Sequence, residues 1–179
     1  MNPTTKNVRY MLKESNAIEG VFGRYPLVQA GRAWRYAMNF DKITPEIIKE
    51  IHRIMMIGLP LEPRHRGAWR DIPVYIGGEK KSQPPLVIQR QIEEWCEKTN
   101  TVDRNFDPVT LHIAFEEIHP FVDGNGRVGR LLLNWHLVKR NNAPLLVYTH
   151  TDRKTYYRLF ASYRAKEMGM MIEMMRGLL

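Results

Sequence analysis

The apolar positions of the chain recur mainly at three- and four-residue steps, which is the spacing of one face of an α-helix. The clearest run lies at 41–58, where Thr44 is a capping residue, Pro45 suits the first helical position, and isoleucines follow at helical spacing. Two further runs, each with a proline near its start, predict helices at 84–98 and 107–118. These patterns indicate a mostly helical protein.

Two later segments add to the helical pattern. Residues 125–139 are apolar on nearly all sides beyond the first turn, which predicts a central helix surrounded by others. Residues 152–173 begin with an acidic capping residue and continue with aromatic and aliphatic side chains at helical steps. We therefore expect one α-helical domain over 1–179.

One short stretch has the alternation of a β-strand. In "RDIPVYIGGEKK", Ile72, Val74 and Ile76 alternate with Pro73 and Tyr75, and two glycines follow that can turn the chain back. This pattern predicts a β-hairpin within the otherwise helical chain.

Composition and charge narrow the class of protein. The chain has 44% hydrophobic and 26% charged residues, no apolar run of about 18 residues that a membrane span needs, and no N-terminal secretory pattern. Its single cysteine, Cys96, excludes an internal disulfide and fits a reducing compartment. The net charge is +8, but the arginines are scattered rather than clustered, so nucleic acid is not expected as a direct ligand. We expect a soluble, cytoplasmic protein.

The segment "HPFVDGNGRVGR", residues 119–130, gathers several groups suited to phosphate chemistry. Pro120 ends the preceding helix, so the imidazole of His119 can project into a cleft as a general base. Asp123 supplies a hard oxygen ligand for Mg²⁺, and the glycines at 124 and 126 let the backbone approach an anion at the start of the next helix. Arg127 and Arg130 share one helical face and can bind further phosphate oxygens. Phosphoryl or nucleotidyl transfer is the chemistry that these groups favour.

Three other interpretations fit parts of this segment. The run Gly124 to Gly129 matches the dinucleotide pattern G-x-G-x-x-G, but it follows a helix, and no acidic residue lies between it and Asp152, where the pattern needs one about twenty positions on. The Glu-x-x-His step at Glu116–His119 would need a second helical copy to form a di-iron site, and the only other copy lies in a proline-broken loop. A plain glycine-rich turn between core helices stays open as a third reading.

The same segment resembles the signature of the Fic family, HPFx(D/E)GN(G/K)RxxR, and meets it at every fixed position. The resemblance implies an all-α core with a β-hairpin flap, a helix-loop-helix over 107–142 that carries the motif, and transfer of AMP from ATP to a hydroxyl side chain of a target protein. It implies that His119 deprotonates this hydroxyl and that Asp123 holds Mg²⁺, with Mn²⁺ as a second candidate. The nucleotide phosphates would be bound by Gly124, Asn125, Gly126, Arg127 and Arg130. The related Doc toxins, which are kinases, carry lysine where this chain has Gly126, so the glycine favours nucleotidyl transfer.

The resemblance extends to two segments before the motif. The stretch "GAWRDIPVYIGG" is similar to the family's flap, here 67–81, which implies that Val74, Tyr75 and Ile76 bind an extended target segment. The stretch "SNAIEG" matches the family's inhibitory pattern (S/T)xxxE(G/N) through Ser15, Glu19 and Gly20.

This second match is similar to the class of Fic proteins whose inhibitory helix precedes the core, here 5–20. It implies that Glu19 pairs with Arg130 and so makes ATP bind in an unproductive pose. The sequence therefore suggests a protein adenylyltransferase that its own N-terminal helix inhibits, with ATP as substrate and a target protein modified on Ser, Thr or Tyr. The alternatives are a related enzyme that uses another nucleotide or removes AMP, and a non-catalytic interaction domain. Homo-oligomerisation is left open.

Overall fold

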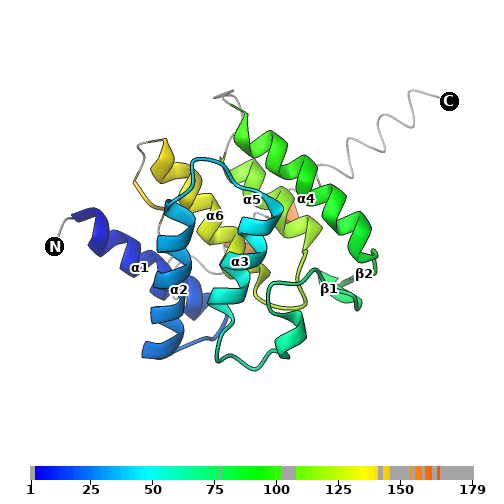
Figure 1. Ribbon diagram of the computed structural model, residues 1–179, viewed down its shortest axis with the longest axis horizontal. Helices are drawn as coiled ribbons and strands as arrows, with labels where there is room; N and C mark the ends of the chain where they lie inside the picture. The colour runs from blue at the N-terminus through cyan, green and yellow to red at the C-terminus, as the bar shows by residue number, and fades with distance from the viewer. Residues whose placement is uncertain are drawn as a thin grey trace. The chain divides into compact units, whose positions relative to one another are not determined.

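The structure is a computed structural model that describes residues 3–76, 78–101, 108–140 and 143–145, and eight residues nearer the C-terminus (Figure 1). The chain divides into two compact units, residues 1–146 and 147–179. The first unit carries every element labelled in Figure 1.

The first unit is built almost entirely of helices. In chain order its elements are α1 (Pro3–Ile18), α2 (Arg24–Met38), α3 (Pro45–Met55), the short 3₁₀ helix η1 (Pro63–His65), β1 (Val74–Ile76), β2 (Glu79–Lys81), α4 (Pro85–Asn100), α5 (Pro108–Ile118) and α6 (Asn125–Lys139). The mostly helical fold with one hairpin is confirmed. The cap of α3 is also confirmed, because Thr44 Oγ1 accepts a hydrogen bond of 3.4 Å from the Ile47 amide.

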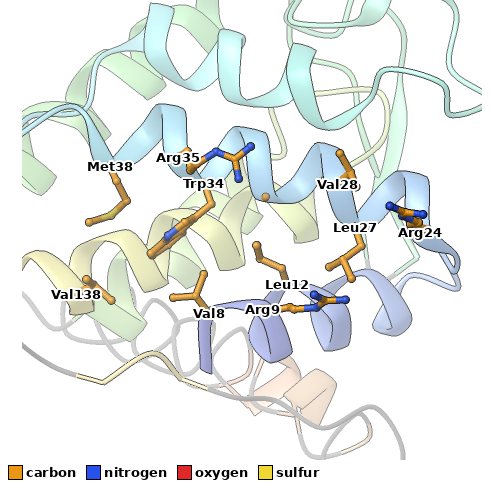
Figure 2. A pocket seen from close by; sticks show the side chains of 11 residues that line it. Val8, Arg9, Leu12, Arg24, Leu27, Val28, Trp34, Arg35, Met38 and Val138 are labelled. Carbon is orange, nitrogen blue, oxygen red and sulfur yellow. The ribbon is translucent and has the colours of Figure 1, made fainter. Parts of the chain in front are cut away.

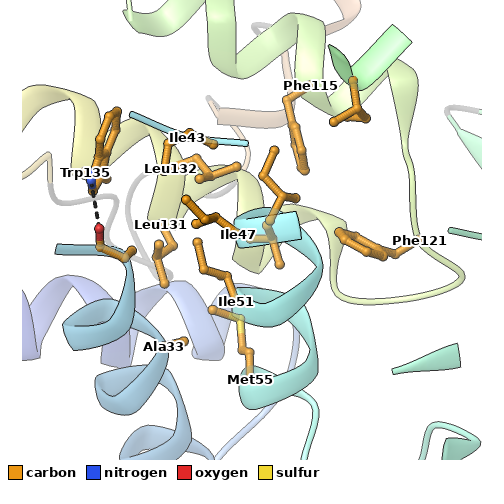
Figure 3. Close-up of a cluster of buried hydrophobic side chains, with 14 of the residues drawn as sticks. Ala33, Ile43, Ile47, Ile51, Met55, Phe115, Phe121, Leu131, Leu132 and Trp135 are labelled. Atoms are coloured by element: carbon orange, nitrogen blue, oxygen red, sulfur yellow. Dashed lines mark hydrogen bonds between the residues drawn. The ribbon is translucent and has the colours of Figure 1, made fainter. Parts of the chain in front are cut away.

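Helix α6 is the central helix, as its apolar composition predicts. It contacts α1, α2, α3 and α5, and it lies behind α2 and α3 in Figure 1. The aliphatic side chains of α6 meet those of α3 and α5 in the main core, where Leu131 and Leu132 lie near Ile47 and Phe115 (Figure 3). Trp135 Nε1 donates a hydrogen bond of 3.1 Å to the Ala37 carbonyl of α2. Figure 3 marks this bond with a dashed line. The segment that begins at residue 125 is therefore held rigidly from several sides.

Helix α2 has no counterpart among the helices predicted from the sequence. Its buried face consists largely of alanines, with Trp34 as its one large buried apolar side chain. Pro26 in its first turn and Gly31 near its middle further weaken the pattern. The spacing of Leu27, Trp34 and Met38 is nevertheless helical, so a signal was present in the sequence.

The predicted hairpin is confirmed, with a shorter first strand than the alternation indicates. Val74 pairs with Lys81 in an antiparallel register, and Gly78 has a φ of 91° in the turn. The side chains of Val74 and Ile76 are buried, whereas Tyr75 is 70% exposed. The alternation predicted Ile72 in the strand, but β1 begins at Val74 and the side chain of Ile72 is 42% exposed.

In the second unit, the described residues 154, 156–158, 160–162 and 165 are helical, which agrees with part of the helix expected at 152–173. The rest of that predicted helix lies outside the described residues, and the single domain over 1–179 stays a prediction. Across the described part of the chain, no helix has the length and apolar character that crossing a bilayer requires.

Candidate active site

The segment 119–130 begins with a strained backbone turn. His119 donates its amide to the Phe115 carbonyl at 3.1 Å and so closes the last turn of α5, but its own φ is 50°, in the left-handed region. Such a conformation costs a non-glycine residue about 1–3 kcal/mol, so surrounding contacts must hold it in place. Pro120 then prevents any continuation of the helix. Helix α5 therefore ends at Ile118, and His119 lies in the turn that follows it.

Arg70 supplies those contacts. Its backbone amide donates to the Pro120 carbonyl at 2.8 Å, and its Nε donates to the His119 carbonyl at 2.8 Å. Its two terminal nitrogens donate to the Lys81 carbonyl at 3.3 Å and to Gln83 Oε1 at 2.6 Å. The side chain is fully buried. One guanidinium therefore joins the hairpin to the backbone of His119.

A histidine on α3 holds the next part of the loop. His52 Nδ1 accepts the Gly67 amide at 2.8 Å, so the proton of the neutral ring is on Nε2, which donates to the Asp123 carbonyl at 3.0 Å. Burial lowers the pKa of His52 to about 4, which keeps the ring neutral at pH 7. The ring stacks on Phe121 with centroids 3.7 Å apart. Both contacts fix the loop between His119 and α6.

The imidazole of His119 has the tautomer that a general base requires. Its Nδ1 lies 3.2 Å from the Glu116 carbonyl, which can only accept, so Nδ1 carries the proton and Nε2 keeps a free lone pair. Burial lowers the pKa of His119 below its ordinary value, and the nearby charge of Arg70 acts in the same direction. His119 is therefore a neutral base at pH 7.

The first turn of α6 provides backbone donors beside this base. Gly124 precedes the helix with a φ of 81°, and a side chain there would also lie 2.8 Å from Met56 Sδ. The first bond of the helix runs from the Val128 amide to the Gly124 carbonyl at 3.0 Å. The amides of residues 125, 126 and 127 come before that bond and have no helical acceptor, and together with the positive end of the helix dipole they suit an anion.

Asp123 and Asn125 behave differently, although both belong to the motif. The Asp123 side chain is 62% exposed, and its Oδ1 accepts the Gly124 amide at 2.6 Å. Asn125 is buried, and its amide bonds both backbone groups of Phe121, at 2.8 and 2.9 Å. The side chain of Asn125 thus closes the loop, and only its backbone amide is left for an anion.

Arg127 is buried and only weakly paired. Its Nη2 lies 3.4 Å from Asp123 Oδ2, while Nε and Nη1 have no hydrogen-bond partner among the described residues. Burial lowers the pKa of Arg127, because the low-dielectric surroundings disfavour its charge. A buried guanidinium with two unpaired nitrogens keeps the capacity to bind an anion.

Arg130, in contrast, is bonded through Nε and Nη2 to the C-terminal end of α1. Its Nε donates to Ser15 Oγ at 2.9 Å, and its Nη2 donates both to the Ser15 carbonyl at 3.0 Å and to Glu19 Oε1 at 2.6 Å. The guanidinium is buried, whereas the Glu19 side chain is 31% exposed. The predicted pairing of Glu19 with Arg130 is thus present in the structure.

Two glycines make this pairing sterically feasible. Gly20, with a φ of 70°, ends α1 in a Schellman motif, in which the Val21 amide bonds the Asn16 carbonyl and the Gly20 amide bonds the Ala17 carbonyl, both at 3.0 Å. This ending places Glu19 directly after the last residue of α1, where its carboxylate reaches Arg130 of α6. A side chain at Gly126 would clash with Glu19 Oε1 and with the Arg130 guanidinium.

The structure thus brings together seven residues predicted from the sequence. They are Ser15, Glu19, His119, Asp123, Gly126, Arg127 and Arg130.

In the hairpin, Val74 and Ile76 point into the protein, so only Tyr75 presents its side chain to the outside. Sequence reasoning missed Arg70 and His52. A signal for His52 existed, because it lies four residues after Ile48 on the apolar face of α3.

The structure offers no multi-ligand metal centre in its described part. No group of three or more His, Cys, Asp or Glu side chains there could hold a metal ion. Glu116 and His112 are buried with 4.0 Å between their nearest polar atoms, and burial raises the pKa of Glu116 to about 8. The exposed carboxylate of Asp123, next to an anion site, fits Mg²⁺, which takes one or two carboxylates and completes its shell with substrate phosphates and water.

Comparison with known proteins gives consistent matches. Residues 42–137 match the model of the Fic/DOC family. The chain is 34% identical over 121 residues to "Protein adenylyltransferase Fic" of Drosophila grimshawi, which is 65% of this chain and 24% of that protein. It is 32% identical over 133 residues to "Protein adenylyltransferase fic-1" of Caenorhabditis elegans, which is 72% of this chain and 25% of that protein. The chain thus spans about a quarter of the length of these curated relatives.

Solved structures share the fold. Fic-1 of C. elegans (residues 134–508) superimposes with a TM-score of 0.69 at 22% identity, over 91% of this chain and 56% of that one. A Fic domain containing signaling protein from Bacteroides thetaiotaomicron gives 0.72 at 19% identity, over 88% and 72%. Since the family match covers more than half of the chain and includes the whole of 119–130, the chain belongs to the Fic/DOC family.

Proposed function

We propose that this chain transfers AMP from ATP to a hydroxyl side chain of a target protein, and that α1 holds the enzyme in an inhibited state. The observation that carries the proposal is the position of Arg130, which belongs to the helix of the anion site but is bonded to Ser15 of α1 and to Glu19 just beyond its end. The names of the curated relatives support the adenylyl-transfer part. The contacts of α1 support the inhibition.

The chemical step uses the free Nε2 of His119. This nitrogen takes the proton of the target hydroxyl as the hydroxyl oxygen attacks the α-phosphorus of ATP. The bond from that phosphorus to the oxygen bridging the α- and β-phosphates breaks, so pyrophosphate leaves and the target carries AMP in a phosphodiester. The neutral ring, bonded through Nδ1 to Glu116, has the protonation state that this role requires.

Charge on the departing pyrophosphate is balanced by groups around the start of α6. The backbone amides of residues 125 to 127 and the unpaired nitrogens of Arg127 bind phosphate oxygens. Asp123 would hold Mg²⁺ or Mn²⁺, which supplies further charge neutralisation when bound. Arg130 completes the set only when Glu19 releases it.

Asp123→Ala should lower AMP transfer by about two to three orders of magnitude at saturating Mg²⁺, because removing a group that offsets transition-state charge costs this much in comparable sites. Asp71→Ala is the matched control. Asp71 is half-exposed and lies outside the motif, so this substitution removes the same negative charge at a different place. The measurement is incorporation of labelled AMP against metal concentration. Undiminished transfer in Asp123→Ala, or in wild type with EDTA, would contradict this role.

The target is held by the hairpin in this proposal. A two-stranded sheet leaves one backbone edge of each strand unpaired, and an extended segment of another protein can add to such an edge as a further strand. Because Val74 and Ile76 are buried, side-chain selection of the target falls to Tyr75. The partner is thus a protein with a Ser, Thr or Tyr hydroxyl in an extended segment.

Arg70→Lys should lower kcat for AMP transfer by about tenfold to a hundredfold with little change in the KM for ATP. A lysine cannot bond the His119 carbonyl and the hairpin at once, and a small misplacement of a catalytic group costs about this much. Arg66→Lys is the control, because the bonds of Arg66 within the described part of the chain run to the Leu59 and Leu61 carbonyls and not to His119. Both variants should lose about 1–3 kcal/mol of stability through unpaired carbonyls. Equal effects of the two variants on kcat would show that Arg70 has no positioning role.

The position of the label tests the transferred group. ATP labelled on its α-phosphate should leave label on protein in a Glu19→Gly preparation, whereas ATP labelled on its γ-phosphate should release all label as pyrophosphate. The same assay with GTP, CTP and UTP reads the base preference. Label retained from the γ-phosphate would identify a kinase and overturn the proposal.

A further inference from the structure

A groove distant from His119 lies between α1, α2 and the end of α6 (Figure 2). It has a volume of about 760 Å³, within the range of about 300–1,000 Å³ typical of small-molecule sites. Its floor is apolar and includes Leu12, Leu27, Trp34 and Met38. Gly31 keeps the middle of the floor open, because a side-chain carbon there would have only one atom, Arg35 Nη1, within 4 Å, at 3.9 Å.

The polar part of the groove carries one sign of charge. Arg9, Arg24 and Arg35 are its charged lining residues, and no acidic side chain is among the described residues that line it. Figure 2 shows Arg9 on α1, with Arg24 and Arg35 on α2. Three exposed guanidinium groups around an apolar floor match a ligand with an apolar body and an anionic head.

We propose that this groove binds a single-chain amphiphile with a carboxylate or phosphate head, free in solution rather than within a bilayer. An open groove of this volume suits one flexible apolar chain, and the arginines at its margin suit one anionic group. Neither the family's signature nor the proposed chemistry uses these residues.

The groove shares a helix with the inhibitory contact. Val8 and Leu12 line the groove, and Ser15 and Glu19 follow at positions that continue the same face of α1. The stripe from residue 8 to residue 19 spans about 16 Å of helix. Since α1 forms one wall, the groove exists only while α1 is docked, so a ligand in it binds the docked state more tightly. This step rests on the proposed function, and it predicts that the amphiphile strengthens inhibition.

Binding is tested without any activity assay, with dodecanoate carrying bromine on its chain as the probe. Bromine quenches a tryptophan that it contacts, so quenching of Trp34 fluorescence should be saturable and absent in Trp34→Phe. Arg24→Glu combined with Arg35→Glu should weaken binding at least tenfold, whereas Arg32→Glu, exposed on α2 and outside the groove, should leave it unchanged. Equal binding of dodecyltrimethylammonium, or quenching that survives in the double variant, would overturn the site. Sedimentation with phosphatidylglycerol vesicles in place of free dodecanoate would overturn the assignment to a soluble ligand.

The coupling has its own readout. Saturating dodecanoate should lower AMP incorporation by wild type about fivefold or more and should not change it in Glu19→Gly. If neither protein transfers AMP while quenching follows the predicted pattern, the proposed function fails and the binding site stands. Increased incorporation in wild type would overturn the coupling.

Discussion

Glu19→Gly should raise AMP incorporation about tenfold to a hundredfold over wild type at the same ATP concentration. In the resting protein, Arg130 donates to Glu19 at 2.6 Å and to Ser15 through two further bonds, so phosphate oxygens must compete for an occupied guanidinium. A hydrogen bond between charged groups contributes about 1.5–3 kcal/mol, and 1.4 kcal/mol is a factor of ten. Removing the carboxylate therefore releases Arg130 for the nucleotide.

The conservative replacement gives the control for this prediction. Glu19→Gln keeps the length of the side chain and an oxygen for Arg130 but removes the charge, so its increase should be smaller than that of Glu19→Gly. Thermal stability should not rise in either variant, because the freed Arg130 loses a partner and gains none until ATP binds. Equal incorporation by wild type and Glu19→Gly over a range of ATP concentrations would show that the ion pair does not inhibit.

His119→Ala should lower AMP transfer by about 10²- to 10⁴-fold, because a general base contributes about this much, and ATP affinity should change little. Alanine is strained at a φ of 50°, so His119→Asn is the better matched variant, since asparagine tolerates left-handed backbone and can still donate to Glu116. Both variants should fold and bind ATP, and both should show this reduction in AMP transfer. Transfer near the Glu19→Gly rate in a Glu19→Gly, His119→Asn protein would exclude His119 as the base.

The pH dependence of transfer gives a second reading of the same group. Burial lowers the pKa of His119, so the neutral base persists below pH 6.5, the ordinary value for histidine. The midpoint of the acid-side decline in transfer by Glu19→Gly should therefore lie below pH 6.5. A decline centred above pH 6.5 would indicate that another group is titrating.

The sequence was sufficient for the local parts of the site. Pro120 marks the end of a helix, and the glycines at 124 and 126 mark a close backbone approach, so the placement of the loop and of α6 follows from residues that are neighbours in the chain. The pairing of Glu19 with Arg130, 111 positions away, came from the family resemblance and not from any local pattern.

The residues that support the site could not be predicted from the sequence, because their contacts join residues that are far apart in the chain. Arg70 donates to the backbone carbonyls of His119, Lys81 and Gln83. Every residue type has a backbone carbonyl, so the sequence does not indicate which carbonyls accept these bonds. The motif suggests Asn125 as a phosphate ligand, but both polar groups of its side chain are hydrogen-bonded to the backbone of Phe121. Contacts between side chains and backbone depend on tertiary structure, which is why sequence reasoning found the chemistry but not its supports.

The most direct test of an adenylyltransferase held inactive by α1 is incorporation of α-phosphate label in four proteins: wild type, Glu19→Gly, Arg130→Ala and the double variant. We predict low incorporation in wild type, high incorporation in Glu19→Gly, and none in either protein that lacks Arg130, because inhibition acts on the arginine that catalysis needs. High incorporation in the double variant would contradict this prediction, since Glu19 would then be acting on some group other than Arg130.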